Sequence, residues 1–280
     1  MFLLIAPLRV NDTLMKKNPI RSYVITTYLT FWLMVLVLCG GASMVFHASP
    51  LVMRILADVC AWSPTIVLLV MWRRLRPEQS FRDFLTRCFS GRIVWWWLLL
   101  LAILVAGGVV GSAWLLSCFE HKAMSSYLSM GGWALGTSLV LSILSGPTGE
   151  ELGWRGYLRE ELAVRYPFMK AALIQGAIWT FWHTILWFVD SDFAGWQLLP
   201  YVLSNLIVMT CLAYMMNVIL ERHNNLIYSI LIHFSFNFPY CFLQVNIGFY
   251  VILSVVFLLL ATAFYFWRQK TQQGKLRVER

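Results

Sequence analysis

A bundle of membrane-spanning α-helices is the fold class that this sequence predicts, on three observations. Apolar residues fill 60% of the 280 positions and charged residues only 12%, whereas roughly a quarter of an ordinary soluble domain is charged. The apolar residues occur in runs of about 20, the length that crosses a bilayer as a helix. These runs are spread evenly along the chain, so residues 1–280 are expected to form a single integral membrane domain.

Eight such spans are predicted. They lie near residues 22–46, 51–72, 93–116, 130–158, 168–189, 197–220, 226–245 and 247–267. The second carries Arg54 and Asp58, and the fourth contains Gly146-Pro147 followed by charged residues, so either can be shortened or broken. Because Arg54 and Asp58 are four residues apart on one helix face, we expect them to neutralise each other near the outer interface.

The positive charges predict the orientation of the spans. Cytoplasmic loops of membrane proteins are enriched in Lys and Arg. With both termini inside, 20 of the 22 Lys and Arg fall in inner segments, one (Lys122) in an outer loop and one (Arg54) within a span. One missed or invented span would invert every later loop and destroy this asymmetry, so the sequence predicts an N-in, C-in protein.

The formal charge of +9 does not require a nucleic-acid partner, because Lys and Arg in a membrane protein first report topology and contact with anionic lipid. We expect no nucleic-acid partner. We do expect contact with anionic lipid at the inner leaflet, with the basic stretch 73–87 lying on that surface. The six cysteines include no CxxC pair and are expected to be free thiols. The apolar residues 1–7 are too short for a signal-peptide core, so no cleavable targeting segment is expected.

Three segments place charged or imidazole side chains at membrane depth, where each is costly and needs a partner or a function. They are 146–156 with Glu150 and Glu151, 179–183 with His183, and 233–237 with His233 and Asn237. A single intramembrane histidine is usually a satisfied core residue, and a single Glu–Arg pair is usually structural. The occurrence of all three segments on separate helices favours a functional site.

Residue spacing predicts how the first segment is used. Glu151 and Arg155 are four residues apart, so they share a helix face and can form an ion pair that allows both to be buried. Glu150 then points about 100° away, without a partner. Two backbone alternatives stay open. Thr148 and Glu151 can form a capping box after Pro147, which places Glu150 in the positive field of a helix N-terminus, or the helix continues with a kink.

The second and third segments add two imidazoles and an amide. His233 and Asn237 are four residues apart and face the same point from one helix. Counted from the inner ends of their spans, Glu150, His183 and His233 lie ~14, ~20 and ~12 Å deep at helical rise. With ordinary helix tilt, these groups can meet in one cavity nearer the cytoplasmic face.

These residues resemble the CPBP family of intramembrane proteases, which includes the CAAX prenyl endopeptidases and the bacteriocin-processing, Abi-like immunity proteins. The family pattern is EExxxR, FxxxH and HxxxN, each on its own transmembrane helix. The chain matches it with Glu150-Glu151 and Arg155, with His183, and with His233 and Asn237. It departs at Trp179, where the family usually has Phe. The resemblance covers residues 130–245, the expected catalytic core.

The resemblance implies an intramembrane endopeptidase whose cavity opens toward the cytoplasm. Glu150 with His183 would activate a water for attack on a peptide carbonyl, His233 and Asn237 would stabilise the oxyanion, and Glu151 with Arg155 would be structural. The metal content stays open. Glu150, His183 and His233 can form a three-ligand Zn²⁺ site, and a metal-free glutamate mechanism uses the same residues. The sequence has no HExxH, GxGD or suitably placed GxS element of other intramembrane proteases.

Two other classes of protein use buried Glu, His and Arg. A transporter can use them as a proton or ion relay, and a non-catalytic member can act as a membrane scaffold or immunity partner. For the protease, the expected partner is a peptide or membrane-protein substrate. Short loops and compact size favour a bacterial plasma membrane, while the substrate, its prenylation and the oligomeric state are left open.

Overall fold

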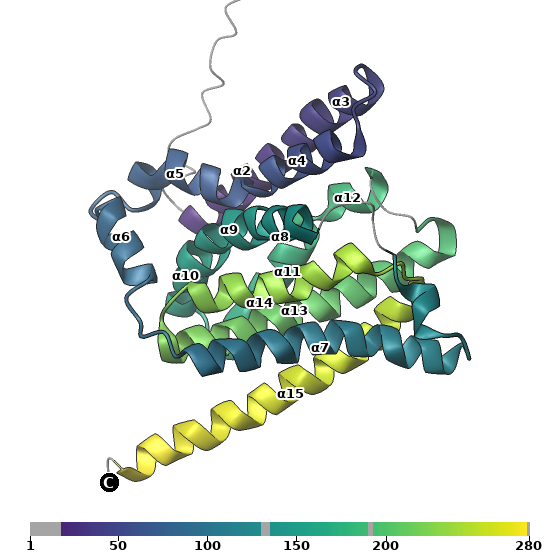
Figure 1. Cartoon of the computed structure of the whole chain (residues 1–280). Helices are drawn as coiled ribbons and strands as arrows, with labels where there is room; N and C mark the ends of the chain where they lie inside the picture. Colours follow the sequence, from purple (N-terminus) through teal and green to yellow (C-terminus); the bar gives the residue numbers. More distant parts are fainter. Residues whose placement is uncertain (1–17, 130–134, 190–192, 279–280) are drawn as a thin grey trace, which may run out of the picture.

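The computed structural model describes residues 18–129, 135–189 and 193–278, with side chains up to residue 273. Within these ranges the chain is helical and forms no β-strand (Figure 1). Its elements are α2 (Pro19–Met34), η1 (Val35–Cys39), α3 (Gly40–Met44), α4 (Pro50–Ala61), α5 (Ser63–Leu75), α6 (Phe81–Cys88), α7 (Trp95–Phe119), η2 (Met124–Tyr127), α8 (Leu135–Leu144), α9 (Gly146–Glu151), η3 (Leu152–Leu158), α10 (Arg159–Arg165), α11 (Phe168–Trp182), α12 (Thr184–Val189), η4 (Gly195–Gln197), α13 (Leu198–His223), α14 (Ile227–Asn237), η5 (Phe238–Phe242) and α15 (Ile247–Val278). The predicted all-helical membrane bundle is confirmed.

Six helices in the described part of the chain are long and apolar enough to cross a membrane. They are Pro19–Met44, Pro50–Leu75, Trp95–Phe119, Phe168–Val189, Gly195–His223 and Ile247–Gln273. They correspond to six of the eight predicted spans. The predicted fourth and seventh spans are not continuous long helices. The fourth is divided into α8, α9, η3 and α10, and the seventh is the short helix α14 followed by the 3₁₀ turn η5.

The fourth segment bends at Ser145, immediately before the glutamates. Ser145 has φ −76° and ψ −130°, outside helical geometry, and Pro147 follows in the first turn of α9, where its fixed φ is tolerated. The Thr148 hydroxyl donates to the Ile143 carbonyl at 2.9 Å and does not cap a helix. The capping-box alternative is therefore wrong, and the helix does not simply continue with a kink, because it is interrupted at Ser145.

The helix then widens into the π-helix η3, directly after Glu151. The Arg159 N–H bonds to the Trp154 carbonyl, a five-residue step in place of the usual four. Nearly all of η3 is buried. Such π-bulges are rare and occur frequently at functional sites.

The second span, which carries Arg54 and Asp58 and was expected to be shortened or broken, is interrupted at Trp62, between α4 and α5. The Trp62 indole N–H donates to the carbonyl of Leu144 at the end of α8, at 2.7 Å. α9 and the α4–α5 junction come so close here that a β-carbon added at Gly149 would lie 2.7 Å from the Trp62 Cδ1. Gly149 therefore permits α9 to pack on the α4–α5 junction. Further along α4, the predicted Arg54–Asp58 pair is present at 3.1 Å.

The segments that carry the three motifs lie inside the bundle. α9 packs against α5 and α14, while α11 packs against α13 and α14 against α7. In Figure 1 these motif helices are surrounded by α2 and α5 on one side and by α7 and α15 on the other. This arrangement shields the motif residues from lipid.

Two further predictions concern residues outside the site. All six cysteines are free, as expected. The basic stretch 73–87 contains α6, but two of its arginines form ion pairs with α10. Arg87 bonds to Glu160 at 2.8 Å and Arg76 to Glu161 at 2.8 Å. Residues 1–7, where a targeting segment was considered, lie outside the described residues.

Candidate active site

The predicted Glu151–Arg155 ion pair is confirmed, with 3.0 Å between Oε1 and Nη1 and both side chains fully buried. The same Oε1 accepts a second hydrogen bond, from the His233 Nδ1 at 2.8 Å. A carboxylate that accepts a hydrogen bond from Nδ1–H fixes the orientation of an imidazole and leaves Nε2 as its functional nitrogen. Glu151 therefore positions His233 in addition to neutralising Arg155.

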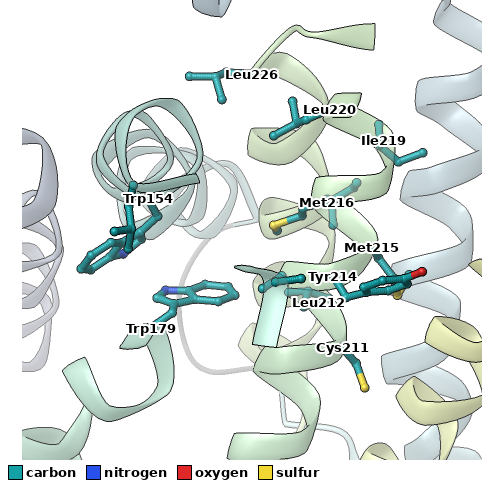
Figure 2. Close-up of a cluster of buried hydrophobic side chains, with 14 of the residues drawn as sticks. Trp154, Trp179, Cys211, Leu212, Tyr214, Met215, Met216, Ile219, Leu220 and Leu226 are labelled. Carbon is teal, nitrogen blue, oxygen red and sulfur yellow. The ribbon is translucent and has the colours of Figure 1, made fainter. Parts of the chain in front are cut away.

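Glu150 is buried and forms no ion pair within the described residues; its carboxylate is held by two indoles instead. Its side chain is only 3% exposed. The Oε2 atom accepts from the Trp179 Nε1 at 2.6 Å and from the Trp154 Nε1 at 3.3 Å. Figure 2 shows the two indole rings close together, with their nitrogen atoms toward each other. Neutral donors orient this carboxylate, and Arg155 interacts with it electrostatically without forming an ion-pair contact.

The other oxygen of Glu150 faces His233 across Gly146. A β-carbon added at Gly146 would lie 2.6 Å from the Glu150 Oε1 and 2.9 Å from the His233 Nε2. These two atoms are therefore at most 5.5 Å apart (2.6 plus 2.9 Å). A side chain at this position would occupy the space between them, so Gly146 keeps the carboxylate and the imidazole accessible to each other.

Trp179 connects the parts of the site, a role that the sequence did not reveal. Its indole face carries the Arg155 guanidinium, with Cζ 3.8 Å from the ring centroid, a cation–π contact. Its ring also packs edge-on against His233, with centroids 5.1 Å apart. The departure from the family's Phe thus supplies a hydrogen-bond donor to Glu150 that Phe lacks. An indole N–H at membrane depth needs an acceptor. This requirement was the sequence signal from which the role of Trp179 could have been found.

His183 ends α11 and is only partly buried. Its Nδ1 lies 2.9 Å from the Trp179 carbonyl oxygen, which can only accept, so Nδ1 carries the proton and Nε2 is the acceptor. The ring interacts electrostatically with Glu150 and His233. The structure thus brings His183 beside the buried pair, in indirect contact through Trp179.

Asn237 lies at the edge of this cluster. Its side-chain amide makes no hydrogen bond to a group in the described ranges, and the residue lines a cavity of about 210 Å³ together with Arg54, Tyr240 and Cys241. The sequence placed Glu150, His183, His233 and Asn237 around one cavity. In the structure, Glu150 and His233 form a buried pair, while Asn237 faces this neighbouring cavity.

A second buried network supports the π-helix. The Gln175 Nε2 donates to the Trp154 carbonyl at 2.6 Å, and the Gln175 Oε1 accepts from the Asn217 Nδ2 at 2.7 Å. Both side chains are almost fully buried. This network links α13 and α11 to the residue whose indole holds Glu150. Polar amides within predicted spans were the signal for it, since each needs a partner in an apolar setting.

The candidate zinc ligands Glu150, His183 and His233 do not form a metal-holding group in this arrangement. Among the residues that the structure describes, no three His, Cys, Asp or Glu side chains are placed to bind one ion. The Nδ1 atoms of both histidines and the Oε2 of Glu150 are engaged with protein groups, which leaves the two Nε2 atoms and the Glu150 Oε1 as the remaining ligand atoms. A catalytic zinc requires three converging ligands at about 2.0–2.2 Å, which this arrangement of the described side chains does not provide.

The fold and the site define an integral membrane protein with buried carboxylates and imidazoles. A family model described as type II CAAX prenyl endopeptidase Rce1-like matches residues 132–239, a range that contains every motif residue from Glu150 to Asn237. CAAX prenyl protease 2 of Methanococcus maripaludis is 26% identical over 224 residues, which cover 76% of this chain and 82% of the relative.

These similarities confirm the resemblance to the CPBP family that the motifs predicted. Within it, the similarity is to the CAAX type of intramembrane protease.

Proposed function

We propose that the chain hydrolyses a peptide bond within the membrane, with Glu150 as the general base. The observation that carries this proposal is the Glu150 carboxylate itself. It is buried and oriented by two indole N–H groups, it forms no ion pair in the described chain, and its Oε1 lies within 5.5 Å (2.6 plus 2.9 Å) of the His233 Nε2. A structural glutamate at membrane depth is expected to pair with a cation, as Glu151 does. Glu150 does not, so its carboxylate is available for chemistry.

The proposed reaction begins with a water held by the Glu150 Oε1 and the His183 Nε2. Glu150 takes a proton from the water as its oxygen attacks the substrate carbonyl, which gives a tetrahedral oxyanion. His233 and Asn237 stabilise that oxyanion. Glu150 then passes the proton to the departing amine nitrogen, and the carboxylate is restored. The absence of a side chain at Gly146 leaves room for the water or the carbonyl beside Glu150.

The substrate in this proposal is a peptide or a membrane protein that reaches the site from the cytoplasmic side. The matched family and relative are both named for CAAX prenyl substrates, so a prenylated peptide is the first candidate to test. The charge distribution supports a location with anionic lipid at the inner leaflet, and we place the protein in a bacterial plasma membrane.

The test is proteolysis of a panel of prenylated and unprenylated peptides by purified protein and by its Glu150→Gln variant. Gln keeps the size of Glu and its capacity to accept from both indoles but removes the basic carboxylate. Turnover is expected to fall to background, while the melting temperature and peptide binding persist. Asn237→Ala is expected to retain more activity, with a loss of about 10²–10³-fold, the usual effect of one oxyanion donor.

The matched control is Glu221→Gln, which neutralises a glutamate outside the site and should leave turnover unchanged. Metal analysis of the same sample tests the zinc alternative. Cleavage at the parent rate by Glu150→Gln would refute this mechanism. If that variant and His233→Ala also keep the full cellular phenotype, the chain is a scaffold. Ion flux that persists in Glu150→Gln would instead indicate a transporter.

A further inference from the structure

The cavity beside Asn237 contains a cation that the proposed reaction does not use. Its lining comes from two separate parts of the chain: Arg54 on α4, and Asn237, Tyr240 and Cys241 at the end of α14 and in η5. These lining residues offer a guanidinium, an amide, a phenol and a thiol, and none is acidic. A cavity with one positive charge and neutral donors favours an anion.

The guanidinium of Arg54 is only partly committed to Asp58. The contact with Asp58 is made by Nε, at 3.1 Å from Oδ1, and the Arg54 side chain is 41% exposed. Within the described chain, neither Nη atom forms a hydrogen bond or an ion pair. Arg155, the other arginine enclosed by the spans, is completely buried by contrast. Arg54 therefore presents two donor nitrogens in the planar geometry that carboxylates bind.

Asp58 maintains this arrangement. Its side chain is 12% exposed, and it lies one helical turn from Arg54 on the same face. Through this charge contact with Nε it neutralises the cation in the absence of a ligand and keeps the guanidinium near α4. Such a supported arginine is preorganised for a carboxylate, because fewer rotamers are lost on binding.

The position of the cavity connects Arg54 to the reacting groups. His233 and Asn237 are one turn apart on α14, about 6 Å at helical rise, and Asn237 lines the cavity with Arg54. A peptide whose carbonyl lies at Glu150 and His233 would pass Asn237 to reach Arg54. An extended chain advances about 3.3 Å per residue, so about two residues of peptide cover the axial distance from His233 to Asn237, at the wall of the cavity that Arg54 also lines.

We propose that Arg54, supported by Asp58, binds a carboxylate of the peptide substrate in this cavity and so selects which peptides are cleaved. The carboxylate belongs either to the free C-terminus or to an acidic side chain, which bind the guanidinium in the same way. This inference rests on the proposed protease function. It is tested by binding alone, so its failure can be distinguished from failure of the catalytic proposal.

The experiment measures Kd by fluorescence anisotropy on the detergent-solubilised Glu150→Gln protein. The probes are a dansyl-labelled, S-farnesylated CAAX-type peptide with a free C-terminus, the same peptide as its C-terminal amide, and two amidated versions ending in Asp or Asn. At least one carboxylate peptide is expected to bind about 10- to 100-fold more tightly than its neutral counterpart, as for a charge-assisted bidentate contact. The acid–amide and Asp–Asn comparisons identify the source of the carboxylate.

Removal of the site should abolish this preference. Arg54→Gln combined with Asp58→Asn removes both charges and leaves neither unpaired, so the preference should fall to near unity. Arg54→Lys keeps a cation beside Asp58 but loses the planar donor geometry, and its preference should fall severalfold. Arg74→Gln, an exposed arginine at the far end of the same span, is the control and should keep the parent preference.

Equal affinity of the parent for both members of each peptide pair would overturn the inference. So would a preference that persists in the double variant. If the double variant does not fold, Arg54→Lys decides the question, and an unchanged preference in that variant overturns the inference. The two proposals can fail separately. If Glu150→Gln abolishes cleavage but the protein shows no preference for carboxylate peptides, the catalytic proposal stands and only the role of Arg54 is rejected.

Discussion

Trp179 lies where the three motif segments meet. Its indole nitrogen bonds to Glu150, its face carries Arg155, and its edge contacts His233. The Glu150 carboxylate, which we propose as the base, is therefore oriented mainly by the Trp179 indole and not by a charged group. A base must be held in productive geometry throughout the reaction, so Trp179 is expected to affect the rate more than substrate binding.

Trp179→Phe tests this role at the residue scale. Phe keeps an aromatic ring beneath Arg155 but removes the 2.6 Å hydrogen bond to Glu150. We expect kcat to fall by about one order of magnitude, the effect of about 1.4 kcal/mol, with KM and melting temperature little changed. The measurement is steady-state cleavage kinetics combined with thermal unfolding.

The control for this substitution is Trp187→Phe, which truncates another buried tryptophan outside the site. It should leave kcat unchanged. Equal kcat for Trp179→Phe and the parent would show that the Trp154 donor alone is sufficient to orient Glu150.

Contacts within one helix were predictable from the sequence, and contacts between helices were not. The Glu151–Arg155 and Arg54–Asp58 pairs follow from i, i+4 spacing and are present. The bonds from His233 to Glu151 and from Trp179 to Glu150 join residues 82 and 29 positions apart. Helical periodicity contains no information on such pairs, because they depend on how the helices are rotated and packed.

At the scale of the element, the π-helix η3 determines where the motif residues point. A regular helix was assumed for residues 146–156, and that assumption gave the correct partner for Glu151. It gave no indication of the wider turn, since the five-residue step of η3 is not a feature of amphipathic spacing. The Gln175–Asn217 network lies directly behind this turn and holds the Trp154 carbonyl.

Gln175→Leu tests whether this network supports the turn. The change removes the bond to Trp154 and leaves the buried Asn217 amide without its acceptor, which is expected to cost about 1–3 kcal/mol. Because Trp154 also donates to Glu150, kcat should decrease as well. Thermal unfolding and cleavage rates measure the two effects.

The matched comparison is the double variant Gln175→Leu, Asn217→Leu. Removing both amides leaves no unpaired donor, so part of the stability lost in Gln175→Leu should return, a coupling expected only for residues in contact. Strictly additive losses would mean that the two side chains act independently.

At the scale of the whole molecule, the two interrupted spans still run across the bundle. α14 has 11 residues, which rise only ~16 Å, about half of the hydrocarbon thickness. Yet segment 226–245 follows α7 along its full length. At one end the Leu226 N–H bonds to the Cys88 carbonyl, before α7 begins, and at the other the Gln244 N–H bonds to the Tyr127 carbonyl, after α7 ends.

The fourth segment has comparable connections. α10 pairs with α6 through Glu160 and Arg87, while the Ser142 hydroxyl of α8 contacts the Cys241 thiol near the opposite end, at 3.3 Å. The positive-charge pattern predicted eight crossings without regard to helix length. The breaks at Ser145 and after Asn237 were only partly predictable, because sequence identifies helix-breaking residues but not how far the chain bends at them.

Reporter fusions decide whether both interrupted segments cross the membrane. With eight crossings and both termini inside, fusions after Arg76, Arg222 and Arg280 should report the cytoplasm, and a fusion after Lys122 should report the outside. If segment 226–245 did not cross, Arg280 alone would change sides. If only the segment from α8 to α10 did not cross, the fusions after Arg222 and after Arg280 would both report the outside. Either result would place the motif residues at a different depth, since Glu150 and His233 belong to these two segments, and the route from the cytoplasm to Glu150 would have to be redrawn.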